Sequence, residues 1–341
     1  MKKIAIIRLS SLGDIVHTLP AFQLLRRHYA DAKITWIVEA PGAALLENFS
    51  GIDELVVFNL KAQRGLKAKI VFLFRFVRRW RRSFDLLIDF QGLVKSALLA
   101  FLLGGTRLGF CSRNTREPLA ALFYSRRAAY FPEHQHVIFK NIHLLSALGI
   151  DATTVDYPLK KPAASPRLQP LMTELGWPER RYIALNVGGG WPTKVLSAEQ
   201  WVEIAAGLRP DYPLVLLWGN EQEEKMAAAV ARRSGAVIAP FLNFSELIYL
   251  IGQAQLVISG DTLALHLADL TRTPAVGIFG PSSPRRNGPL FPRSRVIVQE
   301  QPCSFCYRRK CATMDCLKNI VIADIVAAAK ELDHAADRKT D

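Results

Sequence analysis

Polar residues that could bind or activate a substrate follow apolar segments at several points of the 341-residue chain. The first group is the loop Ser10-Ser11-Leu12-Gly13-Asp14, which separates an apolar segment from a helical one. Asp14 can cap that helix or face a substrate as a general base, and the loop alone leaves both roles open. Gly13 allows the backbone to come close to a ligand. The loop lacks the G-x-G-x-x-G pattern, which argues against a nicotinamide dinucleotide site.

A glycine-rich loop with a lysine opens the second half of the chain. Its sequence is Gly188-Gly189-Gly190-Trp191-Pro192-Thr193-Lys194. Exposed backbone N–H groups followed by a lysine suit a phosphate or a pyrophosphate, although the spacing is not that of a P-loop. A flexible loop with a solvated lysine is the alternative, and we favour phosphate binding.

Acidic residues and a histidine follow two later apolar segments. Glu221 and Glu223 lie just after Trp218, where a carboxylate can hold ribose hydroxyls or simply occupy the first turn of a helix. Asp261 ends another segment, and His266 comes five residues later. A lone histidine is usually structural, but this spacing after a strand-end carboxylate indicates a site.

Four cysteines lie within fourteen residues near the C-terminus, in the pattern C-x2-C-x4-C-x4-C: Cys303, Cys306, Cys311 and Cys316. The spacing differs from that of a standard zinc ribbon. A structural zinc, reduced thiols and paired disulfides all remain open, with zinc favoured over disulfides if the protein is cytosolic. Cys111 stands apart, and we expect it to be buried and inert.

The elements that must position these loops are strands alternating with helices. The expected strands cover residues 2–9, 34–39, 54–59 and 85–90 in the first half, and 182–187, 213–218, 255–260 and 274–280 in the second. Near-continuous apolar strands separated by helices predict parallel sheets covered on both faces. The fold class is therefore α/β, with two doubly wound domains facing a central cleft. Ligands of such sheets bind beyond the carboxyl ends of the strands.

The domain boundaries follow from composition. Residues 1–160 form an N-terminal Rossmann-like domain, 161–181 a linker rich in Pro and Ser, 182–320 a C-terminal Rossmann-like domain, and 321–341 a last helix that could pack back on the first domain. We also expect helices over 15–29, 221–234 and, from the capping-box pair Ser197 and Gln200, over the residues up to Leu208.

The net charge of +14 is concentrated in the first half, where residues 1–160 hold 23 Lys and Arg against 12 Asp and Glu. This asymmetry indicates an anionic partner, for which nucleic acid, an anionic membrane and an acidic glycolipid are candidates. General solubility is the simpler explanation. Residues 66–82 combine an apolar stripe (Leu66, Ile70, Leu73, Val77, Trp80) with five arginines. That pattern suits a helix on an anionic membrane surface, but equally a helix that covers a sheet.

Composition excludes several classes. The chain is 50% hydrophobic and 22% charged, so it can bury a core and is not disordered. No apolar run reaches the length of a transmembrane helix, and Arg8 and Asp14 interrupt the first apolar segment, which therefore resembles a strand rather than a secretion signal.

Six segments, taken together, resemble the lipopolysaccharide heptosyltransferases of glycosyltransferase family 9. They are SSLGDIVHTLPA, IDFQGLVKSALLA, NTREPLAALFYSRR, GGGWPTK, SGDTLALHLAD and GPSSPRRNGP, and their order along the chain is that of the family. The DFQGLVKSAL and TREPLA segments bring the chain closest to the heptosyltransferase I subgroup. The resemblance implies the GT-B fold. It also implies specific roles for the residues above.

Asp14 matches the catalytic base of the family, with Ser10, Ser11, Gly13 and Arg116 on the acceptor side. The residues implied in donor binding are Gly188, Gly189, Thr193, Lys194, Glu223, Asp261, Thr262 and His266. Glu221 is an alternative to Glu223 for the ribose. This chain has Leu263 where the family often has glycine, which affects the geometry expected of that loop. Some members carry similar cysteine clusters, so the four cysteines would be a local structural staple.

The function implied is heptose transfer from ADP-L-glycero-D-manno-heptose to the Kdo-lipid A inner core in lipopolysaccharide biosynthesis. The reaction would be inverting and independent of metal, with no catalytic cofactor and at most a structural zinc. The partners would be the nucleotide sugar, the anionic glycolipid and the inner-membrane surface, on whose cytoplasmic face the protein would sit peripherally. The alternatives are a family 9 transferase for another nucleotide sugar and, from a different class, a non-catalytic nucleic-acid-binding protein. The second alternative lacks the usual nucleic-acid-binding motifs.

Overall fold

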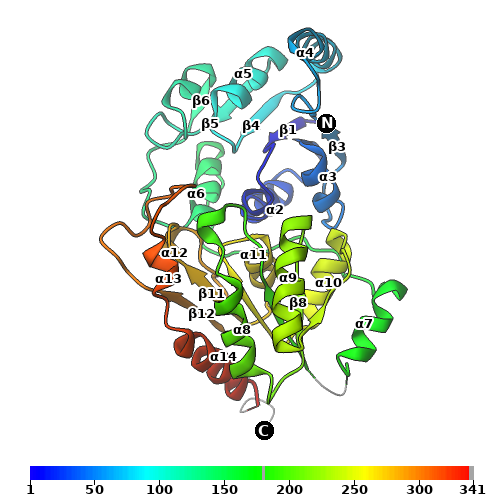
Figure 1. Ribbon diagram of the computed structural model, residues 1–341. Helices are drawn as coiled ribbons and strands as arrows, with labels where there is room; N and C mark the ends of the chain where they lie inside the picture. Colours follow the sequence, from blue (N-terminus) through cyan, green and yellow to red (C-terminus); the bar gives the residue numbers. More distant parts are fainter. Residues whose placement is uncertain (179–180, 338–341) are drawn as a thin grey trace. The chain divides into compact units, whose positions relative to one another are not determined.

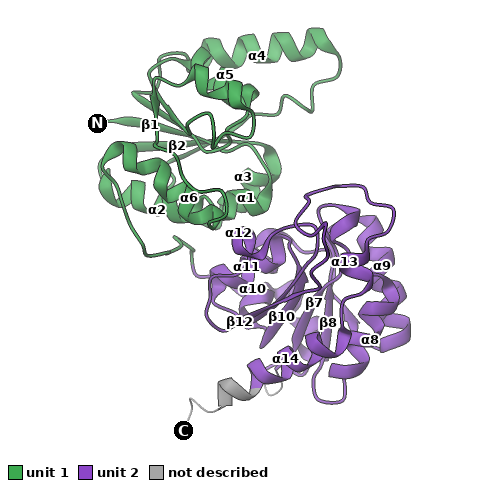
Figure 2. Ribbon diagram, turned by 90° about the vertical axis from the view of Figure 1, so that its left-hand side faces the viewer, with its two compact units in different colours: residues 1–160 green, residues 161–341 purple. Residues whose placement is uncertain are grey.

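The computed structural model describes residues 1–178 and 181–337. The chain divides into two compact units, residues 1–160 and 161–341 (Figure 2). Each unit is built around one six-stranded sheet in which every strand pair is parallel. Figure 1 shows helices on both faces of each sheet, as the near-continuous apolar strands predict.

The first sheet has the order β3-β2-β1-β4-β5-β6. Its strands are β1 Lys3–Ile7, β2 Lys33–Val38, β3 Glu54–Val57, β4 Leu86–Asp89, β5 Thr106–Gly109 and β6 Arg126–Arg127. Helices α4 (Leu66–Trp80) and α5 (Val94–Leu103) cover one face, where Ala5 and Ile7 of β1 share a core with Phe76 and Leu103. The remaining helices of the unit are α1 (Leu12–Val16), α2 (Leu19–His28), α3 (Ala40–Leu46), η1 (Pro118–Phe123), α6 (Val137–Leu144) and η2 (Leu145–Leu148).

The second sheet has the order β12-β11-β10-β7-β8-β9. Its strands are β7 Ile183–Asn186, β8 Leu214–Leu217, β9 Val237–Ile238, β10 Leu256–Gly260, β11 Ala275–Phe279 and β12 Ser294–Val298. Helices α8 (Ala198–Leu208), α9 (Glu221–Ser234) and α14 (Ile322–Asp337) share a large apolar core with this sheet. The other helices are η3 (Pro166–Leu168), α7 (Gln169–Glu174), η4 (Pro192–Lys194), α10 (Phe244–Gln253), α11 (Leu263–Thr271), α12 (Pro284–Asn287) and α13 (Asp315–Lys318).

The two sheets share one topology. In each, the strand order reverses between the first and the fourth strand of the unit, β1 beside β4 and β7 beside β10. Loops diverge at such a switch point, so a ligand can reach the carboxyl ends of both strands. The loops singled out from the sequence follow these strands, and the α/β, doubly wound fold class is confirmed.

Two expectations differ from the structure. The helix expected over 15–29 is two helices, because Pro20 has no N–H to continue α1 and instead lies in the first turn of α2. Residues 161–181, expected as a linker, include η3 and α7 and bury Leu168, Leu171 and Met172. The last helix, α14, packs on α8 and on the sheet of its own unit through Ile325, Ala329 and Leu332. Its packing on the first domain stays a prediction.

Among the described residues no helix combines the length and the apolar character needed to cross a bilayer.

Candidate functional site

Asp14 lies in the first turn of α1, at the carboxyl end of β1. Ser11 is the N-cap of this short helix, and its hydroxyl and backbone N–H both donate to Asp14 Oδ2, at 3.1 and 3.4 Å. The carboxylate thus completes a capping box and is 30% exposed. Capping occupies one carboxylate oxygen and leaves the residue accessible, so it does not exclude a chemical role.

Arg8 holds the other oxygen of Asp14. Its guanidinium Nη2 lies 3.0 Å from Asp14 Oδ1, and its side chain is 6% exposed. Arg8 also donates to the carbonyl of Phe90 after β4, which fixes the guanidinium at the switch point. Burial by itself raises the pKa of Asp14, but Arg8, the Ser11 N–H, Arg116 and the Ser11 hydroxyl together hold it below its ordinary value. Asp14 is therefore ionised at neutral pH and can accept a proton.

The loop after β4 supports this arrangement from the neighbouring strand. Gln91 Oε1 accepts hydrogen bonds from the N–H groups of Leu9 and Ser10, at 3.0 and 3.2 Å. Buried Asp89 anchors the Gln91 loop by accepting from its backbone and from the Tyr124 hydroxyl at 2.7 Å. Burial raises the pKa of Asp89 despite these hydrogen bonds. Asp89 is thus enclosed, and Asp14 is the accessible carboxylate of the pair.

The residues expected on the acceptor side lie on the same edge of the first sheet. Ser10 and Ser11 are tied to Gln91 and Asp14 as described. Gly13 lies within α1, where its carbonyl accepts from the N–H of His17 at 2.9 Å. Arg116 is exposed, its N–H donates to the carbonyl of Gly92 at 3.0 Å, and its charge acts on Asp14. Two arginines therefore act on this carboxylate.

A buried charge cluster occupies the switch point of the second sheet. Lys194 Nζ lies 2.6 Å from Asp261 Oδ2, and His266 Nε2 lies 3.4 Å from Oδ1. Asn287 donates to Asp261 Oδ2 at 3.3 Å. Burial alone raises the pKa of Asp261, but the hydrogen bonds and charges of His266 and Lys194 hold it far below its ordinary value. Asp261 is ionised and keeps the Lys194 ammonium in place at the end of the glycine-rich loop.

Glu223 joins two loops at this edge. Its carboxylate accepts from the N–H of Gly189 at 3.2 Å and from the N–H of Gly219 at 2.8 Å. A Cβ on Gly188 would lie 2.3 Å from the Glu223 carboxyl, so glycine is needed there for close approach. The alternative, Glu221, is the first residue of α9, and its side chain is exposed. The structure thus brings Glu223 to the glycine-rich loop.

Two threonines of the expected donor set have partners within the second unit. Thr262 Oγ1 accepts from Asn186 Nδ2 at 3.0 Å and lies 2.9 Å from Ser259 Oγ, at the ends of β7 and β10. The buried Thr193 hydroxyl donates to the carbonyl of Arg308 at 2.8 Å. Thr193 therefore fixes the cysteine-bearing segment beside the glycine-rich loop.

The four cysteines of that segment lie near enough to one another that burial and the charges of Cys303, Cys306 and Cys311 raise the pKa of Cys316. Cys303, Cys306 and Cys311 are exposed free thiols, and Cys316 is a half-buried one. Within the part of the chain that the structure describes, no three His, Cys, Asp or Glu side chains gather closely enough to hold a metal ion. The segment is held by backbone hydrogen bonds from Phe305 to Gly280 and from Tyr307 to Pro281, and a structural zinc stays a prediction.

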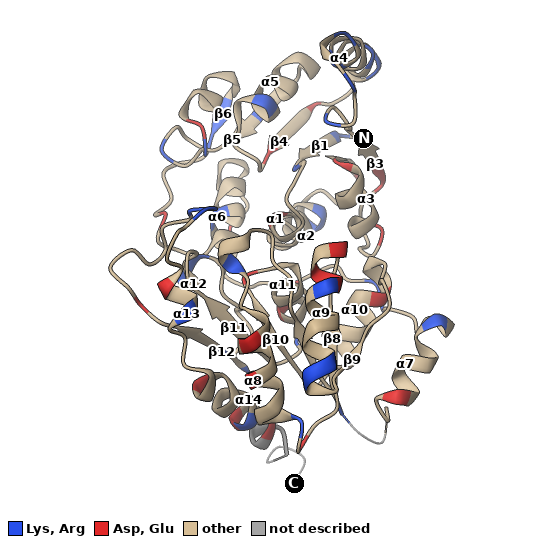
Figure 3. Cartoon of the chain, viewed as in Figure 1, with Lys and Arg blue, Asp and Glu red and all other residues tan. Residues whose placement is uncertain are grey.

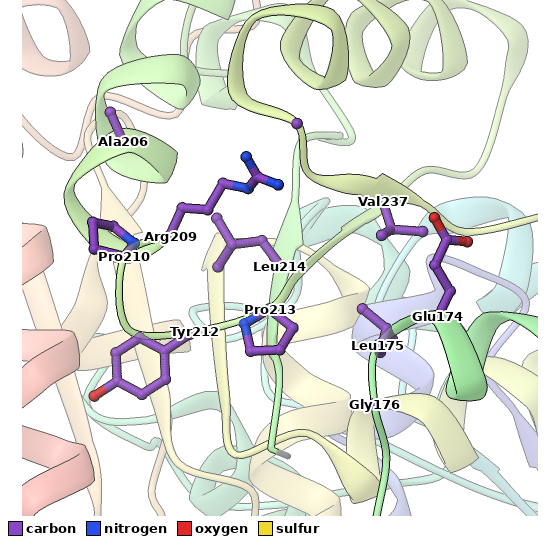
Figure 4. Close-up of a pocket in the computed structure, with 11 residues that line it drawn as sticks. Glu174, Leu175, Gly176, Ala206, Arg209, Pro210, Tyr212, Pro213, Leu214 and Val237 are labelled. Carbon is purple, nitrogen blue, oxygen red and sulfur yellow. The ribbon is translucent and has the colours of Figure 1, made fainter. Parts of the chain in front are cut away.

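A cavity of about 600 Å³ lies elsewhere in the second unit (Figure 4). Leu214 begins β8 and Val237 begins β9, so this cavity opens at the amino ends of the strands. The polar residues on its wall include Glu174, Arg209 and Tyr212. A doubly wound sheet binds its ligands at the opposite edge, so size alone does not make this cavity the donor site.

The model of glycosyltransferase family 9 (heptosyltransferase) matches residues 73–317. The chain belongs to this family. The matched region contains the glycine-rich loop, Asp261 and His266 of the second-unit cluster. Asp14 precedes it.

Curated relatives extend the family similarity to most of the chain. Lipopolysaccharide heptosyltransferase 1 of Pseudomonas aeruginosa is 28% identical over 334 residues, which cover 91% of this chain and 87% of the relative. The Escherichia coli K12 protein of the same name is 28% identical over 83% of this chain and 89% of its own length.

Solved structures agree with the fold. The E. coli heptosyltransferase WaaC with ADP has a TM-score of 0.77 at 25% identity, and the match covers 97% of this chain and 99% of the WaaC chain. The same enzyme with ADP-2-deoxy-2-fluoro heptose has a TM-score of 0.71 at 26% identity, over 88% and 94% of the two chains. The expected GT-B fold is confirmed, and this family 9 chain is a glycosyltransferase.

Sequence reasoning found most of the residues that the structure brings together, but it missed two. It read Arg8 only as an interruption of the first strand, although its guanidinium binds Asp14. Asn287 lies in the segment GPSSPRRNGP, to which the sequence assigns no role, although the residue contacts Asp261. A charged residue at the carboxyl end of an otherwise apolar strand is the signal for Arg8. The signal for Asn287 is its place in that family segment.

Proposed function

We propose that this family 9 enzyme transfers heptose from ADP-L-glycero-D-manno-heptose to the Kdo-bearing inner core of lipid A. The observation that carries the proposal is the ionised, accessible Asp14 carboxylate, held by Arg8 at the switch point of the first sheet. The relatives named lipopolysaccharide heptosyltransferase 1 support the choice of sugar and acceptor. WaaC, solved with ADP and with an ADP-heptose analogue, supports the adenine nucleotide.

The second unit would bind the donor. Lys194 and the N–H group of Gly188 would contact the diphosphate, because a fixed ammonium and a backbone donor stabilise the charge that develops on a leaving phosphate. The N–H group of Gly189 stays on Glu223. Asp261 and His266 would position Lys194 and, with Thr262, lie beside the sugar. Glu223 would bind the ribose hydroxyls and keep the hydrogen bonds that it accepts from the two loop N–H groups.

The first unit would activate the acceptor. Asp14 would take the proton of the acceptor hydroxyl as the oxygen forms a bond to the anomeric carbon, while the bond from that carbon to the phosphate oxygen breaks and ADP leaves. Attack from the face opposite ADP inverts the anomeric configuration. Arg116, together with Ser10, Ser11 and Gly13, would hold the anionic acceptor near Asp14. The lowered pKa of Asp14 keeps it ionised before the reaction.

No step of this mechanism is assigned to a metal, because Lys194 supplies the positive charge at the diphosphate. The cysteine segment has no part in the chemistry. A structural zinc at its four thiols would be a local staple of this segment. A lipid-borne acceptor would bring the enzyme to the cytoplasmic face of the inner membrane as a peripheral protein.

Turnover against a panel of nucleotide sugars tests the proposal. With a Kdo-lipid A acceptor, ADP-heptose should give the highest kcat/KM among ADP- and UDP-sugars. Faster transfer from another nucleotide sugar would make the chain a family 9 transferase of different specificity. Thermal unfolding provides a second measurement, because ADP should raise the melting temperature. Stabilisation by oligonucleotides and not by ADP would revive the nucleic-acid-binding alternative.

A further inference from the structure

Large apolar side chains are exposed on three neighbouring elements of the first unit. Of the fifteen exposed large hydrophobic residues in the described chain, eight lie on α4, α5 and η1. They are Leu66, Ile70, Val71 and Phe74 on α4, Leu98 and Phe101 on α5, and Leu119 and Leu122 on η1. We call these eight residues the apolar surface. Single exposed hydrophobic residues are ordinary, but a concentration of this kind marks an interaction site.

The three elements adjoin one another. Helix α5 packs against both α4 and η1, and Figures 1 and 2 both show α4 next to α5 at one side of the first unit. Phe101 of α5 also contacts Phe123 of η1, with ring centroids 5.8 Å apart. The exposed side chains therefore belong to one region of the surface.

Packing against the sheet does not account for the apolar surface. Phe76 of α4 is buried, and Phe72, Leu73 and Trp80 pack with it on the core of the first unit. That inward face already covers the sheet. Phe74 is 66% exposed and Leu66 74% exposed, on a different side of the same helix. Helix α4 thus carries two apolar faces, only one of which has a partner in the described chain.

The surroundings of the apolar surface are basic. Residues 61–84 contain nine Lys and Arg and no Asp or Glu, and Figure 3 shows blue but no red on α4. Seven of these side chains lie on α4 or just after it: Lys67, Lys69, Arg75, Arg78, Arg79, Arg81 and Arg82. All seven residues are exposed, and none of them forms an ion pair with a carboxylate in the described part of the chain. Their charge is available to an external anionic partner.

We infer that the apolar surface inserts shallowly into an anionic phospholipid bilayer. The apolar side chains would enter the acyl boundary, while the seven basic side chains contact lipid phosphates. A bilayer fits this surface because residues 61–84 carry no acidic side chain, and an unbroken basic border matches an anionic sheet of phosphates. The inference rests on the proposed function for its purpose, since a lipid-borne acceptor lies in such a membrane.

Vesicle binding tests the inference with two variants and a control. The apolar variant replaces Ile70, Phe74 and Leu122 by serine, and the charge variant replaces Arg75, Arg78 and Arg79 by glutamine. The control carries Val296→Ser, Val321→Ser, Lys225→Gln and Arg232→Gln, which change exposed residues of the second unit. Co-sedimentation is measured with vesicles of phosphatidylglycerol and phosphatidylethanolamine, and with phosphatidylcholine vesicles, across a salt series. Circular dichroism and thermal unfolding of every variant show that both units are folded.

Wild-type protein should bind the anionic vesicles and keep part of this binding at 1 M salt, where charges are screened beyond about 3 Å. The apolar variant should bind about tenfold more weakly or worse at every salt concentration, because each lost side chain removes apolar area from the membrane. The charge variant should lose binding mainly at low salt, and the control should bind like wild type. The inference is overturned if wild type does not bind anionic vesicles, or if the apolar variant binds as tightly as wild type.

Turnover separates this inference from the proposed function. The apolar variant should transfer heptose at the wild-type rate to acceptor dispersed in detergent and show a raised KM for acceptor embedded in vesicles. Equal KM values for embedded acceptor would contradict the inference while leaving the proposed function intact. If wild type transfers heptose to neither form of acceptor, the proposed function fails. Vesicle binding then still tests whether the apolar surface enters an anionic bilayer.

Discussion

Replacing Asp261 by asparagine tests whether the second-unit cluster is a coupled charge pair. The side chains of Asp261 and Lys194 are 4% and 12% exposed, and their charged atoms lie 2.6 Å apart. Solvent therefore screens the pair little, and the variant leaves the Lys194 ammonium buried without its counterion. Removing one partner of a buried pair costs about 3 kcal/mol or more. For a unit of this size, that loss lowers the melting temperature by about 6 to 12 °C.

A double-mutant cycle gives the coupling directly. Lys194→Met alone leaves the Asp261 carboxylate with His266 and Asn287 and should also destabilise the protein. Asp261→Asn combined with Lys194→Met removes both charges, so its loss should be smaller than the sum of the single losses by about 1 kcal/mol or more. The assay is urea unfolding at pH 7. Additive losses would refute the reasoning, because uncoupled residues do not form the pair seen here.

The same pair predicts a pH dependence. Because the folded-state pKa of Asp261 is lowered, its contribution to stability is complete above the unfolded value of 3.8 and is lost as the pH falls below it. The difference in unfolding free energy between wild type and Asp261→Asn should therefore be constant near neutral pH and shrink in acid. A difference that grew as the pH fell would contradict the ionised Asp261.

Three further predictions concern other parts of the site. Arg8→Gln removes the guanidinium that lowers the pKa of Asp14, so the acidic limb of the kcat/KM profile should move to higher pH, and an unmoved limb would show that Arg8 does not act on the base. Gly188→Ala places a Cβ against Glu223 and should weaken ADP binding about tenfold in a calorimetric titration, whereas wild-type affinity would show that the Glu223 contact is dispensable. Turnover should survive EDTA, because Lys194 supplies the positive charge at the diphosphate; a rate lost to EDTA and restored by magnesium would contradict the metal-independent mechanism.

The sequence predicts a strand wherever a buried strand forms a continuous apolar segment. Eight strands, the parallel sheets and the loops at their carboxyl ends were all predicted. Of the four strands missed in the described chain, β6, β9 and β12 are edge strands, and β5 lies beside β6. Strand β6 is the exposed pair Arg126–Arg127, and β12 carries Arg295 and exposed Val296, so its apolar run is only three residues long.

The candidate site could be predicted only as a set of separate loops. The position of Asp14 after a strand was visible, but its link to Arg8 depends on the pairing of β1 with β4, which brings the Phe90 carbonyl to the guanidinium. Cysteine spacing leaves a structural zinc, reduced thiols and disulfides open, because spacing does not fix where the thiols lie. That segment is positioned by backbone bonds to the loop after β11 and by Thr193.

The role of Asp14 is the central claim, and one pair of measurements on Asp14→Asn tests it most directly. Asparagine keeps the size of the side chain and removes its ability to accept a proton. Heptose transfer from ADP-heptose to Kdo-lipid A should fall by about 10²-fold or more, the usual scale for a general base, while the Kd for ADP stays unchanged. Near-normal turnover in this variant would contradict the account and leave Asp14 as the capping-box partner of Ser11.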